Sequence, residues 1–146
     1  MISLLKRLMS STPEPLGPTD ARLALSALLV RVARSDGQYD GNEAAEITAI
    51  LMTRYALSQQ EAEELRQQAE LLEADAPDTV RFTRAIKDVV AYEDRAAVVE
   101  ALWEVVLVDG KRDQNEDGLM RLVVKLLGIS DRESAFARQR VAARRG

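Results

Sequence analysis

Apolar residues recur along most of this chain at intervals of three and four positions, which is the spacing of one face of an α-helix. The pattern begins at Thr19 with a nearly all-round apolar stretch, which we expect to form the central helix: Leu23, Leu25, Leu28, Leu29 and Val32. No window alternates apolar and polar residues as a half-buried strand would. The sequence therefore predicts an all-α fold of about seven to eight helices.

Polar residues between the apolar stretches predict where helices start and stop. Gly37 and Gly110 each follow an Asp at the end of an apolar run, where glycine can adopt the left-handed conformation that closes a helix. Thr19 or Asp20 can cap the first of these helices. Four pairs have the spacing of a capping box: Asp40 with Glu43, Ser58 with Glu61, Asp113 with Glu116, and Ser130 with Glu133.

A further helix is predicted after Asp75-Ala76-Pro77, because a capping residue and then a proline favour a helix start. Its apolar residues are Val80, Ile86, Val89 and Val90. The pattern breaks at Glu93-Asp94 and resumes in three more helices. Met120, Val123, Val124 and Leu127 give the second of these an apolar face.

The chain contains one acidic motif twice. Residues 36–43 read Asp-Gly-Gln-Tyr-Asp-Gly-Asn-Glu, and residues 109–116 read Asp-Gly-Lys-Arg-Asp-Gln-Asn-Glu. Each copy lies between two apolar runs and is followed by a Ser-x-x-Glu capping pair. A self-match of this kind is typical of a duplicated helical unit. We therefore expect residues 22–70 and 95–140 to form two copies related by a pseudo-twofold axis.

The amino-acid composition limits the kinds of metal site and partner that this chain can have. The chain is 47% hydrophobic and 30% charged, an ordinary balance for one globular domain, and it has neither Cys nor His. It therefore lacks the ligands of the usual zinc, haem and iron–sulfur sites, so any bound metal is expected to be a hard cation held by oxygen. With a net charge of −4 and only 4% aromatic residues, it is not expected to bind nucleic acid.

The two ends of the sequence differ from its body. Residues 1–18 are predicted to be a short N-terminal helix and a Pro-rich linker, and residues 19–146 the helical domain. One face of the N-terminal helix would carry Ile2, Leu5, Leu8 and Met9, which favours docking on the protein's own core, with a membrane surface or a partner as the alternative. The Arg-rich end is expected either to stabilise the last helix or to bind an anionic partner. The sequence contains no run of about 20 apolar residues, so no transmembrane segment is predicted.

Two interpretations of the acidic motifs stay open. Asp40 with Glu43, and Asp113 with Glu116, could simply cap helices, whereas Asp36 and Asp109 follow helix ends, where the dipole disfavours an acid. The carboxylates could instead surround a weakly bound divalent cation, calcium, magnesium or manganese, with water completing its coordination. The candidate ligands are Asp36, Asp40, Glu43, Asp109, Asp113 and Glu116.

The two motifs in their helical context resemble the tellurite-resistance protein TerB and its wider TerB-like relatives, from about Thr19 to Arg140. The resemblance implies an all-helical, internally duplicated domain without established enzyme activity, linked to tellurite and other stress responses. It also implies that the six acidic positions bind a divalent cation. It further implies that the protein functions together with membrane proteins. We therefore expect a cytoplasmic protein. A membrane-associated protein partner would hold it at the inner face of the membrane.

Two other functions compete with this interpretation. One is a metal-dependent hydrolase in which paired carboxylates use a metal-activated water, and the other is a purely structural helical scaffold. The missing His and Cys, and the absence of phosphate-loop or nucleophile motifs, weigh against an enzyme. Trp103 is expected to pack in the core, with a role in partner binding as the alternative. The sequence predicts neither the oligomeric state nor the partner.

Overall fold

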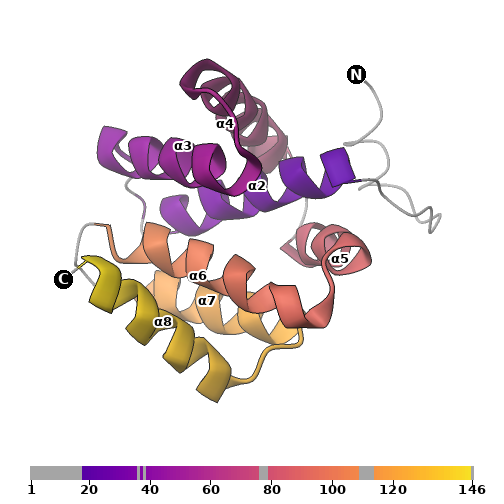
Figure 1. Cartoon of the computed structure of the whole chain (residues 1–146), viewed down its shortest axis with the longest axis vertical. Coiled ribbons are helices and arrows are strands. Elements are labelled where there is room, and N and C mark those ends of the chain that lie inside the picture. Colours follow the sequence, from indigo (N-terminus) through magenta and orange to yellow (C-terminus); the bar gives the residue numbers. More distant parts are fainter. Residues whose placement is uncertain (1–17, 36, 38, 76–78, 109–113, 146) are drawn as a thin grey trace.

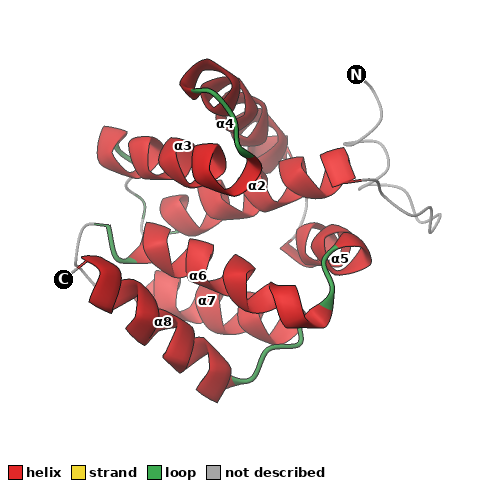
Figure 2. Ribbon diagram, viewed as in Figure 1, coloured by secondary structure: helices red, strands yellow, loops and turns green. Residues whose placement is uncertain are grey.

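The computed structural model describes residues 18–35, 37, 39–75, 79–108 and 114–145, with the side chains of 18–20, 114–117 and 145 left aside (Figure 1). The all-α prediction is confirmed, because helices and their connections make up this part of the chain (Figure 2). The helices are α2 (Pro18–Arg34), α3 (Gly41–Tyr55), α4 (Gln59–Asp75), α5 (Thr79–Val89), the short 3-10 helix η1 (Tyr92–Asp94), α6 (Arg95–Val106), α7 (Gln114–Leu126) and α8 (Asp131–Arg145).

Helix α2 is the central helix, as its all-round apolar pattern predicts. Helices α3, α4, α5, α6 and α7 all pack against it. Leu25, Leu28, Leu29 and Val32 are buried, and so are the small residues between them, Ser26 included. Figure 1 shows α2 passing through the middle of the bundle, with α3 and α4 on one side and α5 to α8 on the other. A helix that is apolar on every face can be buried in this way without stranding polar side chains.

Outside the acidic motifs, the capping box at Ser58 and Glu61 forms as expected, and at Ser130 and Glu133 the bond to the serine cap forms. At the start of α4, the Glu61 N–H donates to Ser58 Oγ (3.1 Å) and the Ser58 N–H donates to Glu61 Oε1 (2.9 Å). The latter bond lowers the pKa of Glu61. At the start of α8, the Glu133 N–H donates to Ser130 Oγ (3.1 Å). These bonds satisfy N–H groups that have no partner within the helix.

Arg95, the first residue of α6, joins the ends of two other helices. Its guanidinium donates to the carbonyl oxygens of Val90 (3.1 Å) and Lys87 (3.4 Å) at the end of α5, and to that of Leu127 (3.2 Å) at the end of α7. A cation at a helix C-terminus satisfies free carbonyls and is favoured by the helix dipole. One side chain therefore fixes where α5, α6 and α7 meet.

Only some of the apolar residues of α5 are buried. Val80 and Val89 are exposed, and the side chains that α5 buries are Phe82, Thr83, Ala85 and Ile86. Residues 82, 85 and 86 share one face of the helix, and residue 80 lies on the opposite side from residue 82. Val89 follows the spacing of the buried face but is exposed as the last residue of the helix.

Several predicted boundaries shift or are not tested. Helix α2 begins at Pro18, one residue before the expected cap, and proline is well suited to a first helical position. Asp75 is the last residue of α4 and was wrongly assigned as the cap of α5. The predicted N-terminal helix and most of its linker lie outside the described residues. None of the described helices combines the length and apolar composition needed to cross a membrane.

The predicted duplication stays a prediction, although the order of elements agrees with it. Helices α2, α3 and α4 are joined by an acidic loop and a Ser-Glu capping box, and α6, α7 and α8 follow in the same order. The first helix of each set packs against the third, α2 against α4 and α6 against α8. A superposition of the two sets is the direct test.

Ala56 gives a test of the backbone at the end of α3. It is exposed and adopts the left-handed conformation, with φ 53° and ψ 47°. This conformation costs a residue with a Cβ about 1–2 kcal/mol. We expect Ala56→Gly to raise the free energy of unfolding by about 1 kcal/mol in urea denaturation.

Ala45→Gly is the matched control for this substitution. Ala45 is exposed within α3, where glycine has no conformational advantage, so the same change should lower the free energy of unfolding by about 1 kcal/mol. Equal losses at both positions would contradict a strained helix end at Ala56.

Candidate functional site

The first acidic loop begins where the central helix α2 ends. The Ser35 hydroxyl donates to the Val32 carbonyl (2.6 Å), and the Gly37 N–H donates to the Arg34 carbonyl (3.0 Å). Gly37 has φ +83°, and a Cβ added there would meet no atom within 4 Å. The left-handed backbone, and not crowding, is therefore what favours glycine here. This confirms the helix end predicted at Gly37.

The loop ends in the capping box of α3. Asp40 Oδ1 accepts the Glu43 N–H (3.0 Å), and Glu43 Oε1 accepts the Asp40 N–H over a longer distance of 3.4 Å. Asp40 is exposed, whereas the Glu43 side chain lies in the protein at 2% exposure. Capping thus explains the position of both acids, but it does not require Glu43 to be this deeply buried.

Tyr39, between the two halves of the motif, fastens the loop to α4. Its hydroxyl donates to Glu70 Oε2 (2.5 Å), and the same oxygen accepts a bond from Arg66 Nη1 (2.6 Å). Arg66 Nε in turn donates to Thr48 Oγ1 on α3 (3.0 Å). Burial, and then the hydrogen bond and charge of Glu70, raise the pKa of Tyr39 to about 12. The network ties the loop, α3 and α4 together.

A second set of ion pairs holds the end of α2 beside the loop. Glu73 on α4 accepts from Arg34 Nη1 (2.7 Å) and Arg31 Nε (3.1 Å), one through each carboxylate oxygen. The Arg34 guanidinium also lies 5.2 Å from the centre of the Tyr39 ring. These cations sit in the last turn of α2, where the helix dipole favours them. Their positive charge lies beside the acidic loop.

The structure places only part of the predicted ligand set. Asp40 and Glu43 lie together at the start of α3. Asp36, Asp109 and Asp113 lie outside the described residues, and Glu116 belongs to α7 with a side chain that is not described. Within the described residues, no group of three or more acidic side chains is arranged to hold a metal ion. The six-residue set and the second loop therefore stay predictions.

Comparison with known proteins agrees with this architecture. The sequence profile of the family described as tellurite resistance protein TerB matches residues 22–139. The chain belongs to the TerB family. The match runs from the first buried turns of α2 to the middle of α8, and so includes both acidic motifs of this TerB domain.

A solved structure shares the TerB fold of this chain. It is a protein of unknown function, PG1108, from Porphyromonas gingivalis W83, with 19% sequence identity and a TM-score of 0.60. The alignment covers 90% of this chain and 96% of the other. At this identity the likeness shows the fold alone. No curated protein matches the chain.

The sequence did not predict the residues that hold the first acidic loop in place, which are Tyr39, Glu70 and Arg66. Tyr39 has Arg112 at the matching position of the second motif, so the repeat does not single it out. Glu70 and Arg66 lie one turn apart on α4 and look like an ordinary surface ion pair in the sequence. Only the packing of α4 beside the loop shows that they hold Tyr39.

The raised pKa of Tyr39 predicts a loss of stability at high pH. Tyrosine in the unfolded chain titrates near 10, and Tyr39 in the folded protein near 12. The protonated hydroxyl therefore contributes its full stabilisation below pH 10, and this contribution is lost as the pH rises from 10 to 12. Urea denaturation across this range should show a falling free energy of unfolding, with a smaller fall in Tyr39→Phe.

Tyr92→Phe is the control for this pH dependence. Tyr92 also donates to a carboxylate, Glu133 (3.1 Å), which raises its pKa, but the pair is exposed and worth less. This variant should keep most of the high-pH loss. An unchanged slope in Tyr39→Phe would show that the loop is not held through the Tyr39 hydroxyl.

Proposed function

We propose that this TerB protein is a non-enzymatic stress-response module that binds a divalent cation through its Asp-Gly-x-x-Asp-x-x-Glu loops. The observation that carries the proposal is the Glu43 carboxylate, 2% exposed at the start of α3 beside the exposed Asp40. A cation above the loop would bind the exposed Asp40 carboxylate and be attracted by the negative charge of Glu43 next to it.

The chemistry of the chain limits the choice of cation. Without Cys or His, the protein offers oxygen ligands, which suit calcium, magnesium and manganese. Each motif supplies three carboxylates, whereas calcium takes about six to eight oxygens, so carbonyl groups and water complete the shell. We therefore expect dissociation constants no tighter than about 10⁻⁷–10⁻⁵ M.

The same loops offer a surface for a basic partner protein. Asp40 is exposed, and the network of Tyr39 with Glu70 and Arg66 keeps the loop in place before any partner arrives. A loop held in its binding conformation loses less entropy on binding. In this proposal the protein works in the cytoplasm, beside membrane proteins of a tellurite or related stress response, and the bound cation regulates that contact.

Asp40→Ser separates capping from cation binding. Serine caps a helix as well as aspartate does, but it carries no charge. We expect the variant to unfold within about 0.5 kcal/mol of the native protein in chelator. Native protein should gain about 2.7 kcal/mol of stability at a cation concentration 100 times its dissociation constant, and Asp40→Ser should lose most of this gain. Calorimetric titration and thermal denaturation measure both effects.

Glu61→Gln is the control, because Glu61 is the acidic member of a capping box outside the acidic motifs. It should bind the cation as the native protein does. Asp36→Asn/Asp109→Asn tests the remaining loop acids and should weaken binding without lowering stability in chelator. An absence of heat and of a thermal shift at millimolar calcium, magnesium and manganese would reduce the acids to helix caps.

A further inference from the structure

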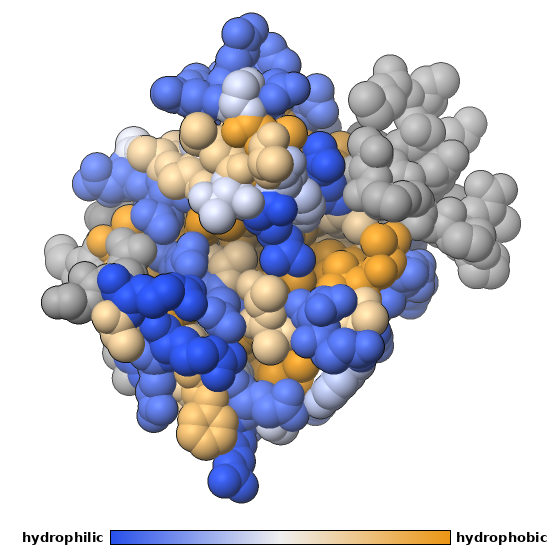
Figure 3. Space-filling model, viewed as in Figure 1, coloured by the Kyte–Doolittle hydropathy of each residue, from blue (hydrophilic) through white to orange (hydrophobic). Residues whose placement is uncertain are grey.

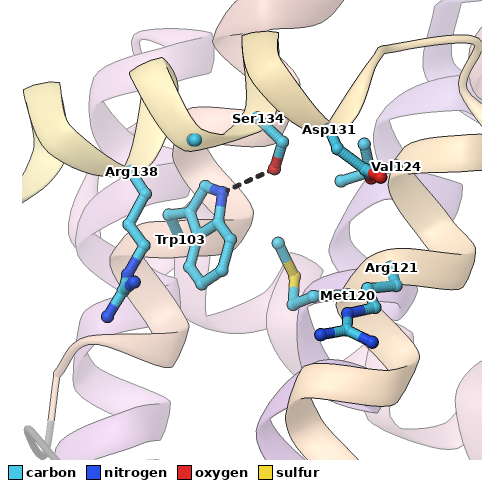
Figure 4. Close-up of a pocket in the computed structure, with 8 residues that line it drawn as sticks. Trp103, Met120, Arg121, Val124, Asp131, Ser134 and Arg138 are labelled. Carbon is cyan, nitrogen blue, oxygen red and sulfur yellow. Dashed lines mark hydrogen bonds between the residues drawn. The ribbon is translucent and has the colours of Figure 1, made fainter.

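A surface pocket of about 380 Å³ lies between α6, α7 and α8 (Figure 4). Its size falls in the range of small-molecule sites, about 300–1,000 Å³. Trp103, Met120 and Val124 form an apolar floor, and Ser134, Arg121 and Arg138 supply the polar groups above it.

The floor of the pocket is held in one arrangement. Trp103 is 8% exposed and its Nε1–H donates to Ser134 Oγ (3.1 Å), as Figure 4 shows. Met120 and Val124 are buried beside it. Ser134 is itself 7% exposed, and its hydroxyl, which accepts the indole bond, donates to no acceptor among the described residues. One buried donor is therefore available to a ligand.

Two arginines flank this floor from opposite sides in Figure 4. The Arg138 guanidinium lies 5.4 Å from the centre of the Trp103 ring. Within the described part of the chain, neither Arg138 nor Arg121 has a carboxylate partner. Asp131 also lines the pocket, so these three side chains together leave it positive.

Unlike the two arginines at the pocket, other arginines on α8 form ion pairs. Arg144 pairs with Glu100 (2.7 Å) and Glu104 (2.9 Å), and Arg140 pairs with Glu100 (3.2 Å). Hydrophilic side chains cover most of α8 on the face shown in Figure 3. Much of the basic C-terminal end is thus neutralised against α6, whereas the arginines at the pocket keep their charge available.

We infer that this pocket binds a small organic anion: a carboxylate with an aromatic or branched apolar body. The carboxylate would accept a hydrogen bond from the Ser134 hydroxyl, and the Arg121 and Arg138 guanidinium groups on either side would attract its negative charge. The apolar body would pack against Trp103. This site is separate from the acidic loops and does not depend on the proposed cation binding.

The single tryptophan of the chain makes the test direct, because Trp103 lines the pocket. In ¹⁵N-labelled full-length protein, its indole N–H gives one NMR signal. Titration with phenylacetate should move this signal saturably, with a dissociation constant of about 1 mM or below. The neutral isostere phenylacetamide should bind at least about tenfold more weakly, because it lacks the charge that the arginines bind.

Charge variants identify where the anion binds. Arg121→Gln and Arg138→Gln should each weaken phenylacetate binding by about tenfold or more, whereas Asp131→Asn should tighten it by removing a repulsive charge. Arg140→Gln is the control on the neighbouring face of α8 and should leave the affinity unchanged. Equal affinity for acid and amide, no movement up to about 10 mM, or binding that survives both arginine substitutions would overturn the inference.

Discussion

Helix α2 has almost no solvent-facing surface between Ala24 and Ala33, because five other helices pack against it. Its direction sets where each of those helices can lie, and its end sets where the first acidic loop begins. At that end Arg31 and Arg34 bind Glu73 on α4, so a buried apolar helix finishes in a fixed pair of cations. The loop is therefore positioned by the core and not by its own residues alone.

Capping and the proposed cation binding would use the same acids. The cap engages Oδ1 of Asp40 and Oε1 of Glu43. The cap fixes where both carboxylates lie, and Tyr39 fixes the backbone that leads to them. A site preorganised in this way spends little binding energy on ordering the loop. The pocket at Trp103 is built differently, from an apolar floor and two arginines.

Local patterns were enough to predict the helices, the central position of α2, the capping box at Ser58, the serine cap at Ser130, and the left-handed Gly37. All of these depend on residues within a few positions of one another. The bonds of Tyr39 to Glu70 and of Arg95 to Leu127 join residues about 30 positions apart, and no local pattern encodes them. The covered side of α5 likewise depends on its packing against α2, which is distant in the sequence.

We propose that the acidic loops, and not acidic surfaces in general, bind the cation. Substoichiometric Mn²⁺ added to ¹⁵N-labelled protein tests it, because the ion broadens the amide signals nearest to it. We expect residues 37–43, with 109–116 if the second loop also binds, to broaden first. The start of α4 provides an internal comparison with the exposed acids Glu61 and Glu64. Stronger broadening there, or equal broadening over the whole surface, would contradict the account.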